Sequence, residues 1–528
     1  MRKSLLLLNI MLLLFLSVLT GCMYSENNSS QKNTKKKSAK SEDASDVLDY
    51  SNKTGQLGFM TYSVPLPTDE QFQLFVDAGL RTMLMSGEYL GFYQGKVLNR
   101  DGVDLEILES FFELAEKYGV GVLDFSMDVA SIINSKERQE IYAKYPNAFK
   151  GLFIGDEPGI IELDDMINRI DWVNTNYPGA IYTTTLHPSW APVDTELDEG
   201  QGKVNSILEY YKYAIDNLLS KMDGPMILCA DDYPCKRYGY DGENFLETLL
   251  FMSAAAMNNP RIIKQMCLNC STFREVNEAP GENSRPVSEW QGAYEKVVTE
   301  MEIRMPAITS LAFGFTSFLY FMYGPFPHSD EMVIERDGCD LTRNMSPIDF
   351  DGPNSVKVTE YYDYIKKTNL ELESFEKCFT SFKWRGTRMI SQSGVYDSVA
   401  KIINAQFSNA YNTFENLTDF ETSGDADVFI GYFKEGKSRE GFFVSNFCGY
   451  ADESYYRKNG LPARDASGVR YDAYSFEYDK DATVTLEFGD FDRVYIVQNG
   501  VTTADMAIEN HQITVELNPG DYIFVIPY

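Results

Sequence analysis

Short apolar runs alternate with amphipathic stretches from residue 57 to residue 323, and this pattern constrains the fold more than any other feature. Runs typical of buried strands lie at 57–62, 81–85, 120–125, 151–155, 180–184, 225–230, 261–268 and 315–323. Segments with helical periodicity separate these runs. The first begins at residue 68, and the others lie at 105–117, 137–145, 161–174, 205–221, 243–258 and 288–308. Eight strand–helix units over about 270 residues predict parallel strands closed into a (β/α)8 TIM barrel. A doubly wound sheet is the alternative, although it has no reason to stop at eight strands.

The pattern changes near residue 385, where helical periodicity gives way to short alternating strands. We expect these strands at 428–433, 440–447, 483–488, 493–498, 511–517 and 522–526. The last two flank Asn518-Pro519-Gly520-Asp521, a sequence typical of a tight turn, so they are predicted to form an antiparallel hairpin. Residues 385–528 are therefore expected to form an antiparallel β-sandwich, after a barrel of residues 51–384.

The N-terminus has the features of an export signal. Met1-Arg2-Lys3 is positively charged, residues 4–20 are almost entirely apolar, and Leu19-Thr20-Gly21-Cys22 follows. The last four residues resemble the lipobox of bacterial lipoproteins. That resemblance implies a signal peptide of residues 1–22, with cleavage before Cys22 and a lipid on its thiol. An ordinary signal peptide or a short membrane anchor is the alternative.

The polar segment 23–50 is expected to be a flexible tether. With a lipid at Cys22, it would hold the folded part in the cell envelope, on the outer side of the cytoplasmic membrane or on the cell surface.

Charge and cysteine content exclude several classes of function. Lys and Arg total 47 and Asp and Glu total 78, and the net charge of −31 argues against a nucleic-acid partner. Of the eight cysteines, Cys22 is assigned to lipidation, and the odd remainder cannot all form disulfides within the chain. Cys267-x-x-Cys270 and the Cys229–Cys235 spacing suggest a zinc site. Because Cys267 lies in an apolar run, buried free thiols are the favoured interpretation, and we expect no metal or cofactor.

Polar and aromatic residues gather where the predicted barrel strands end, which is where barrel enzymes place their active sites. These residues are Ser63, Ser86, Glu88, Tyr89, Asp124, Ser126, Asp156, Glu157, His187, Trp190, Asp231, Asp232, Tyr233, Asn269, Ser271, Thr272, Tyr320, Tyr323 and, further on, His328. Carboxylates beside aromatic rings suit a carbohydrate, which offers hydroxyls to acids and CH faces to rings. The residues expected to bind it are Asp124, Asp156, His187, Trp190, Tyr233 and Tyr323.

The segment Gly151-Leu152-Phe153-Ile154-Gly155-Asp156-Glu157-Pro158 resembles the strand-4 motif of retaining (β/α)8 glycoside hydrolases of the clan A type. Residues 314–323, Asp337-Gly338 and residues 368–373 resemble the end of the barrel in β-galactosidase-like members, whose layout also includes a β-rich domain. The resemblance implies that Glu157 protonates the glycosidic oxygen and later activates water. A carboxylate that merely favours a helix N-terminus is the alternative for Glu157.

The sequence departs from that family at strand 7, where the nucleophilic Glu is expected. Residues 265–271 contain no carboxylate, and the first one that follows is Glu275. Asp231 and Asp232 at the end of strand 6 are therefore the candidates for the second catalytic carboxylate, unless they only hydrogen-bond a loop. Two functions remain open, a surface-anchored glycoside hydrolase acting on an oligosaccharide and a non-catalytic carbohydrate-binding lipoprotein. A solute-binding transport lipoprotein fits less well, because it would have two α/β lobes and no β-rich tail.

Overall fold

The computed structural model describes residues 48, 50–86, 105–125, 135–236, 239–240, 242–270, 272–275, 300–324, 334–336, 339–350, 356–424, 426–447 and 480–528. The chain divides into two compact units, Met1–Leu48 and Asp49–Tyr528, and all of the helices and strands named here belong to the second. The predicted signal peptide, Cys22 and nearly all of the predicted tether lie outside the described residues. Within the described ranges, no helix has the length and apolar character needed to cross a membrane.

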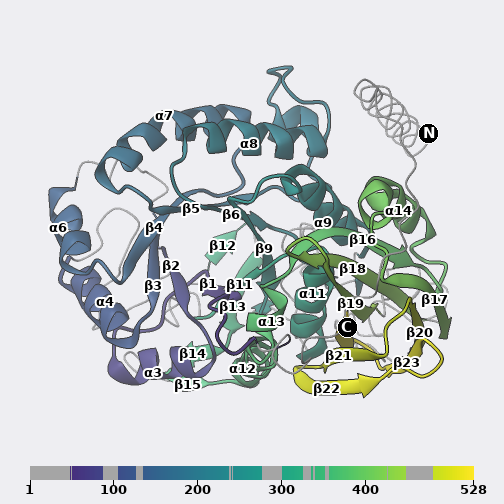
Figure 1. The fold of residues 1–528 in the computed structure, drawn as a ribbon. Coiled ribbons are helices and arrows are strands. Elements are labelled where there is room, and N and C mark those ends of the chain that lie inside the picture. The colour runs from purple at the N-terminus through teal and green to yellow at the C-terminus, as the bar shows by residue number, and fades with distance from the viewer. Residues whose placement is uncertain are drawn as a thin grey trace, which may run out of the picture. The chain divides into compact units, whose positions relative to one another are not determined.

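Eight parallel strands close into a barrel, which confirms the predicted TIM barrel (Figure 1). Each strand pairs with its neighbours in chain order, and the last, β11, closes the barrel by pairing with the first, β1. All eight predicted strands are present: β1 (Gly58–Thr61), β2 (Thr82–Ser86), β3 (Gly121–Phe125), β4 (Phe149–Gly155), β5 (Ile181–Leu186), β6 (Met226–Ala230), β9 (Ile262–Asn269) and β11 (Ser317–Phe321).

Helices follow the strands, and most of them are amphipathic, whereas α11 is buried on all sides. They are α3 (Asp69–Asp77), α4 (Leu105–Tyr118), α6 (Lys136–Lys144), α7 (Ile160–Asn176), α8 (Ile207–Lys221), α9 (Gly242–Ala256), α11 (Glu300–Ala312) and α12 (Glu360–Glu373). In α3, Thr68 caps the helix by accepting a hydrogen bond from the Gln71 backbone, and Phe72 and Phe75 are fully buried. In α3, the apolar spacing in the sequence thus sets which face of the helix packs on the barrel.

The inside of the barrel is mostly apolar, and it contains two free thiols. Cys229 and Cys267 lie in one buried cluster with residues such as Leu84, Phe153 and Leu319. Cys270 is also buried and free. Among the described residues, no group of three or more His, Cys, Asp or Glu side chains could hold a metal ion. These three cysteines therefore match the prediction of buried thiols.

Several short elements lie outside the regular strand–helix units of the barrel. They are the π-helix η2 (Val193–Leu197), α13 (Glu376–Phe379), β7 (Cys235–Lys236) with β8 (Gly239–Tyr240), β14 (Ile348–Phe350) with β15 (Val356–Val358), and a sheet of β10 (Thr272–Glu275), β13 (Cys339–Met345) and β12 (Ile334–Arg336).

The C-terminal part contains two antiparallel sheets, consistent with the predicted β-sandwich. The six-stranded sheet has the order β16 (Lys383–Ile390), β18 (Asp427–Glu435), β19 (Arg439–Phe447), β24 (Tyr522–Pro527), β21 (Arg493–Gln498) and β22 (Val501–Ala507). The three-stranded sheet has the order β17 (Leu417–Gly424), β20 (Ala482–Phe488) and β23 (Gln512–Leu517). Side chains of both sheets form one buried cluster that includes Val428, Val444, Leu486, Ile513 and Val525.

The predicted hairpin of the last two strands is wrong. β23 pairs with β20, whereas β24 pairs with β19 and β21 in the other sheet. The turn at Asn518–Asp521 therefore crosses between the sheets. β24 is buried on both faces, since Val525 packs between the sheets while Phe524 packs on Phe379. A turn signature shows where the chain reverses, but not which strand the next segment pairs with.

The expectation that helical periodicity ends near residue 385 is also wrong. Helix α14 (Asp397–Tyr411) lies between β16 and β17, and it buries Val399, Ala400, Ile403 and Phe407. Phe407 packs edge-on against Trp384 of β16. The spacing of these four residues is helical and can be seen in the sequence.

Candidate active site

The segment after β4 holds Glu157 in an unusual backbone conformation. Its φ is +46°, in the left-handed region that residues other than glycine rarely adopt. Thr185 of β5 accepts a hydrogen bond from the Glu157 backbone at 3.0 Å, and the Tyr210 hydroxyl of α8 donates to the Pro158 carbonyl at 2.6 Å. Contacts from two later elements thus fix the direction of the Glu157 side chain.

Glu157 does not serve the N-terminus of α7. The N-cap of that helix is Gly159, and the Glu162 carboxylate accepts its backbone N–H at 3.0 Å. The favourable place for a carboxylate at this helix end is thus taken by Glu162. The purely structural alternative for Glu157 loses its main support.

The Glu157 carboxyl group is surrounded by protein and by other acids. Burial, together with repulsion from Asp231, Asp156, Glu196 and Asp232, raises its pKa well above the ordinary value of a glutamate. The side chain nevertheless keeps 39% of its surface exposed, so a substrate can reach it. A carboxyl group in this setting retains its proton at neutral pH, as a general acid must.

His187, at the end of β5, adds no positive charge. Its Nδ1 atom lies 3.8 Å from Glu157 Oε1, but burial lowers the pKa of His187 to about 4. The imidazole is therefore neutral at neutral pH. The Tyr211 hydroxyl fixes its backbone by donating to the His187 carbonyl at 2.6 Å.

Asp156 is held from two sides at the mouth of the barrel. The Tyr62 hydroxyl donates to its Oδ2 atom at 3.3 Å, and Thr185 donates to Oδ1. Surrounding protein raises the pKa of Asp156, and these two hydrogen bonds oppose that effect. Tyr62, Thr185 and Glu196 are site residues that the sequence reasoning missed. Tyr62 could have been found, because it ends the first predicted strand.

The structure separates the two candidates at the end of β6. Asp232 is 1% exposed and accepts a hydrogen bond from Thr248 of α9 at 2.8 Å. Thr248 in turn accepts from the Ser189 backbone at 2.9 Å, so Asp232 helps to anchor the loop after β5. Asp231 instead faces the acids of the mouth. Burial and the charge of Asp156 raise its pKa, while the nearby Tyr233 hydroxyl and Cys267 thiol oppose this.

An aromatic chain lies beneath these carboxylates. Tyr233 packs on Phe321 at a ring distance of 5.7 Å, and Phe321 packs on Tyr62 at 5.1 Å. The Tyr62 hydroxyl hydrogen-bonds Asp156, and Tyr233 lies two residues after Asp231, so this chain of rings joins the segments that carry the acids of β4 and β6.

Two of the expected sugar-binding residues do not face the mouth. Asp124 is fully buried and points towards α6, where Tyr142 donates to it and the Arg138 guanidinium lies 3.5 Å away. Its neighbour Leu123 points into the barrel, so alternation along the strand turns Asp124 outward. Tyr323 is also fully buried, packed edge-on against Phe75 of α3.

The remaining strand-end residues lie in different settings. Trp190 lies on the loop after β5 with 49% of its surface exposed, and Ser189 beside it donates to the Asn244 carbonyl of α9 at 2.9 Å. Ser63 is buried and accepts a backbone hydrogen bond from Gly324. β9 ends at Asn269 without a carboxylate, and Glu275 belongs to β10. Glu88, Tyr89, Ser126, Ser271 and His328 lie outside the described residues.

Comparison with known proteins gives a likeness only among solved structures. No protein-family model matches the chain. No curated protein matches it either.

The solved structures to which the chain is similar include a family 44 xyloglucanase of Paenibacillus polymyxa, with 9% identity, a TM-score of 0.40, and coverage of 90% of this chain and 97% of that one. Xylanase 10B of Thermotoga maritima has 9% identity, a TM-score of 0.35, and coverage of 60% and 95%. A truncated 3-deoxy-D-arabino-heptulosonate 7-phosphate synthase of T. maritima has 10% identity, a TM-score of 0.31, and coverage of 61% and 89%. Likeness at these scores does not separate one barrel chemistry from another.

Proposed function

We propose that this chain is a glycoside hydrolase in which Glu157 is the general acid/base and Asp231 is the second carboxylate. The observation that carries the proposal is the setting of Glu157. Its carboxyl group is held at the end of β4 by a constrained backbone, is surrounded by other acids, and is still 39% exposed. Pairs of carboxyl groups with different environments are the usual acid and base of glycoside hydrolysis.

The reaction follows from the protonation of the two groups. Glu157 donates its proton to the glycosidic oxygen as the bond to the anomeric carbon breaks. Asp231, when ionised, either bonds to that carbon or removes a proton from the attacking water. His187 is neutral and 3.8 Å from Glu157, so it neither neutralises the pair nor competes for the proton.

Asp231 suits the second role better than Asp232. Among the charged groups, Asp231 makes the largest contribution to the raised pKa of Glu157. Asp232 already holds Thr248, and through it the loop after β5. We therefore assign Asp232 to positioning of that loop.

The groups around the acids suit an oligosaccharide. Trp190 is 49% exposed, and the Tyr233 side chain is partly exposed, while its hydroxyl lies 3.2 Å from the buried Cys267 thiol. Sugars bind such rings with their CH faces and acids with their hydroxyls. Asp156 and His187 remain proposed binding residues, because they lie beside Glu157.

Substitution of the acids tests the proposal. Against a panel of aryl glycosides and oligosaccharides, Glu157→Gln should lower kcat on poor leaving groups by about 10²–10⁴-fold while sugar binding persists. Asp231→Asn should lose turnover similarly, and Asp232→Asn should lose less, mainly through stability. Full turnover of a substrate by Glu157→Gln would refute the assignment. The anomer released, followed by NMR, distinguishes a nucleophilic Asp231 from a base.

One observation favours the alternative of a non-catalytic carbohydrate-binding protein. In the described residues, β9 ends at Asn269 without the carboxylate that retaining barrel hydrolases use there. Under this alternative, sugars bind wild type and Glu157→Gln alike on a glycan array, and no glycoside is cleaved by either protein.

We also propose that the protein is anchored to the cell envelope by a lipid on Cys22, on the outer side of the membrane. The sequence Leu19-Thr20-Gly21-Cys22 after an apolar segment supports this. Wild type should partition into the detergent phase, and Cys22→Ser should remain in the aqueous phase. Equal partition of the two proteins would contradict the anchor.

A further inference from the structure

A bulge in β4 turns the side chain of Asp156 into the mouth of the barrel. Phe153 belongs to the cluster inside the barrel, whereas a Cβ at Gly155 would lie 2.6 Å from Met166 Sδ of α7, on the outside. Residues two apart in a regular strand point the same way, and a register shift between Phe153 and Gly155 interrupts this alternation. The next side chain, that of Asp156, therefore points inwards, where Thr185 donates a hydrogen bond to it.

Two neighbouring threonines of β5 hold the bulged end of β4. Thr184 pairs in register with Gly155, and its hydroxyl donates to the Gly155 carbonyl at 2.7 Å. The Thr185 side chain is buried, and its hydroxyl donates to Asp156 Oδ1 and accepts the Glu157 N–H at 3.0 Å. A single oxygen atom, Thr185 Oγ1, thus joins the carboxylate of Asp156 to the backbone of Glu157.

The Thr185 hydroxyl satisfies both partners in only one arrangement. A hydroxyl has one proton to donate. Because a lone pair of the oxygen meets the Glu157 N–H, the proton is left for Asp156, which accepts it most strongly when ionised. A hydroxyl whose proton is drawn towards a charge becomes a better acceptor itself. The charge of Asp156 therefore strengthens the hydrogen bond between Thr185 and the Glu157 backbone.

The titratable groups around Asp156 act on its charge in opposite directions. Tyr62 of β1 donates to its Oδ2 atom at 3.3 Å and favours the ionised form, as Thr185 does. The charges of Glu157 and Asp231 act against it. Burial raises the pKa of Asp156, and the two hydroxyl donors lower it. The donors thus preserve the charge on which the Thr185 bridge depends.

We propose that Thr185 is a positioning residue that couples the charge of Asp156 to the backbone of Glu157, so that Glu157 is held most firmly in its direction while Asp156 is ionised. The φ of +46° at Glu157 is the conformation that this bridge supports. The inference rests on the proposed function for its consequence in catalysis, whereas the coupling itself does not depend on it. Asp156 thereby acts on Glu157 in addition to its proposed contact with sugar.

Hydrogen exchange at the Glu157 amide tests the inference without any substrate. NMR of full-length protein labelled with ¹⁵N-glutamate follows this amide, whose signal is identified from its loss in Glu157→Gln. Thr185→Val keeps the shape of the side chain and removes the hydroxyl, so exchange at Glu157 should become about 10–100-fold faster. Thr185→Ser, which restores the hydroxyl, should return most of the difference. The amide of Glu302 in the buried helix α11 is the internal reference for global unfolding.

Thr184→Val is the matched control, because it removes the neighbouring hydroxyl and leaves that of Thr185 in place. Unchanged exchange at Glu157 in Thr185→Val, or an equal acceleration in Thr184→Val, would overturn the inference. Asp156→Asn removes the charge and should accelerate exchange at Glu157 by roughly 2–10-fold. If Thr185→Val does not fold, this second variant gives the answer, and an unchanged exchange rate in Asp156→Asn would refute the coupling.

Activity assays separate this inference from the proposed function. On a glycoside that wild type cleaves, Thr185→Val should lower kcat by about 10–100-fold with little change in KM, and Thr185→Ser should restore most of the loss. Faster exchange at Glu157 in Thr185→Val, with no glycoside cleaved by wild type, would refute the hydrolase and leave the coupling intact. Hydrolysis by a protein whose Glu157 exchange ignores Thr185 would do the reverse.

Discussion

At Glu157, both the backbone and the side chain are held in states that cost free energy. A left-handed φ at a residue other than glycine costs about 1–3 kcal/mol. The carboxyl group is also repelled by the charges of Asp231, Asp156, Glu196 and Asp232, and the nearby His187 is neutral. Strain of this kind persists where the surrounding structure enforces it, as Thr185 and Tyr210 do here. Residues with such costs are often those that function requires.

Glu157→Gln should therefore make the folded protein more stable at neutral pH. The pKa of Glu157 is raised in the folded state, whereas the unfolded chain has the ordinary value near 4.3. Below that pH, Glu157 is protonated in both the folded and the unfolded protein, and it does not lower the free energy of unfolding. As pH rises towards the folded pKa, only the unfolded state ionises freely, so wild type loses stability.

Calorimetry at several pH values measures this effect. We expect a gain in Tm of about 1–2 °C for Glu157→Gln at pH 8 and none near pH 4. Glu113→Gln, on the exposed face of α4, is the control and should change little at either pH. A gain independent of pH would contradict the electrostatic explanation.

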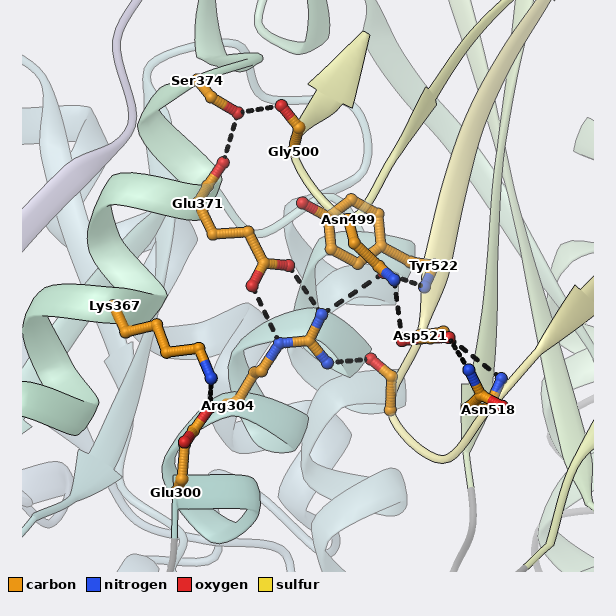
Figure 2. A network of polar contacts seen from close by, with 11 residues as sticks. Glu300, Arg304, Lys367, Glu371, Ser374, Asn499, Gly500, Asn518, Asp521 and Tyr522 are labelled. Atoms are coloured by element: carbon orange, nitrogen blue, oxygen red, sulfur yellow. Dashed lines mark hydrogen bonds and ion pairs between the residues drawn. The ribbon is translucent and has the colours of Figure 1, made fainter. Parts of the chain in front are cut away.

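At the scale of elements, α11 and α12 meet two turns of the β-sandwich in a polar network (Figure 2). The Arg304 guanidinium forms an ion pair with Glu371 at 2.6 Å, and it also donates to the Gly520 carbonyl and to Asn499. Only 9% of the Arg304 side chain and 14% of the Glu371 side chain are exposed. Gly520 has a φ of +70°, and a Cβ there would lie 2.6 Å from Met301 Sδ, so this turn requires glycine.

Loss of Arg304 should be costly, because it leaves a largely buried Glu371 without its partner. We expect Arg304→Ala to lower the free energy of unfolding by about 3–5 kcal/mol. The Lys367–Glu300 pair on the same two helices is the matched control, with side-chain exposures of 65% and 36%. Lys367→Ala should cost less than about 1 kcal/mol. Urea unfolding of both variants measures the difference, and similar costs would show that burial does not decide the strength of these pairs.

At the scale of the whole Asp49–Tyr528 unit, the β-sandwich covers apolar surface of the barrel. Trp384 of β16 donates to the Ala312 carbonyl at 3.1 Å, and its ring lies 3.9 Å from the Lys264 ammonium of β9. Lys264 is buried, which lowers its pKa well below the ordinary value. On the same side, Phe379 packs on Phe433 and Phe524 of the sandwich. The barrel exterior here is shaped for contact with protein rather than with water.

Removal of the sandwich should therefore yield an insoluble barrel. A fragment that ends at residue 384 would divide β16, so we expect the cleaner cut to be at residue 381. The fragment 51–381 should aggregate on expression, because removal of the sandwich exposes the buried side chains of Lys264, Phe313 and Phe379 to solvent. Sedimentation and calorimetry of the fragment provide the test. A soluble fragment with a cooperative melting transition would show that the barrel folds independently.

Sequence alone predicts the alternation of strands and helices, the number of barrel strands and the place of Glu157 at the end of strand 4. Each of these depends on local spacing, since periodicity reports which face of an element is buried. Three features emerge only in the folded chain: β23 and β24 belong to different sheets, Asp124 turns towards α6, and Asp232 turns to Thr248 while Asp231 acts on Glu157. The spacing of apolar residues along the chain shows which face of an element is buried, but the partner of a strand or of a charge is set by residues far away in sequence. In addition, one step along a strand reverses the direction of the side chain.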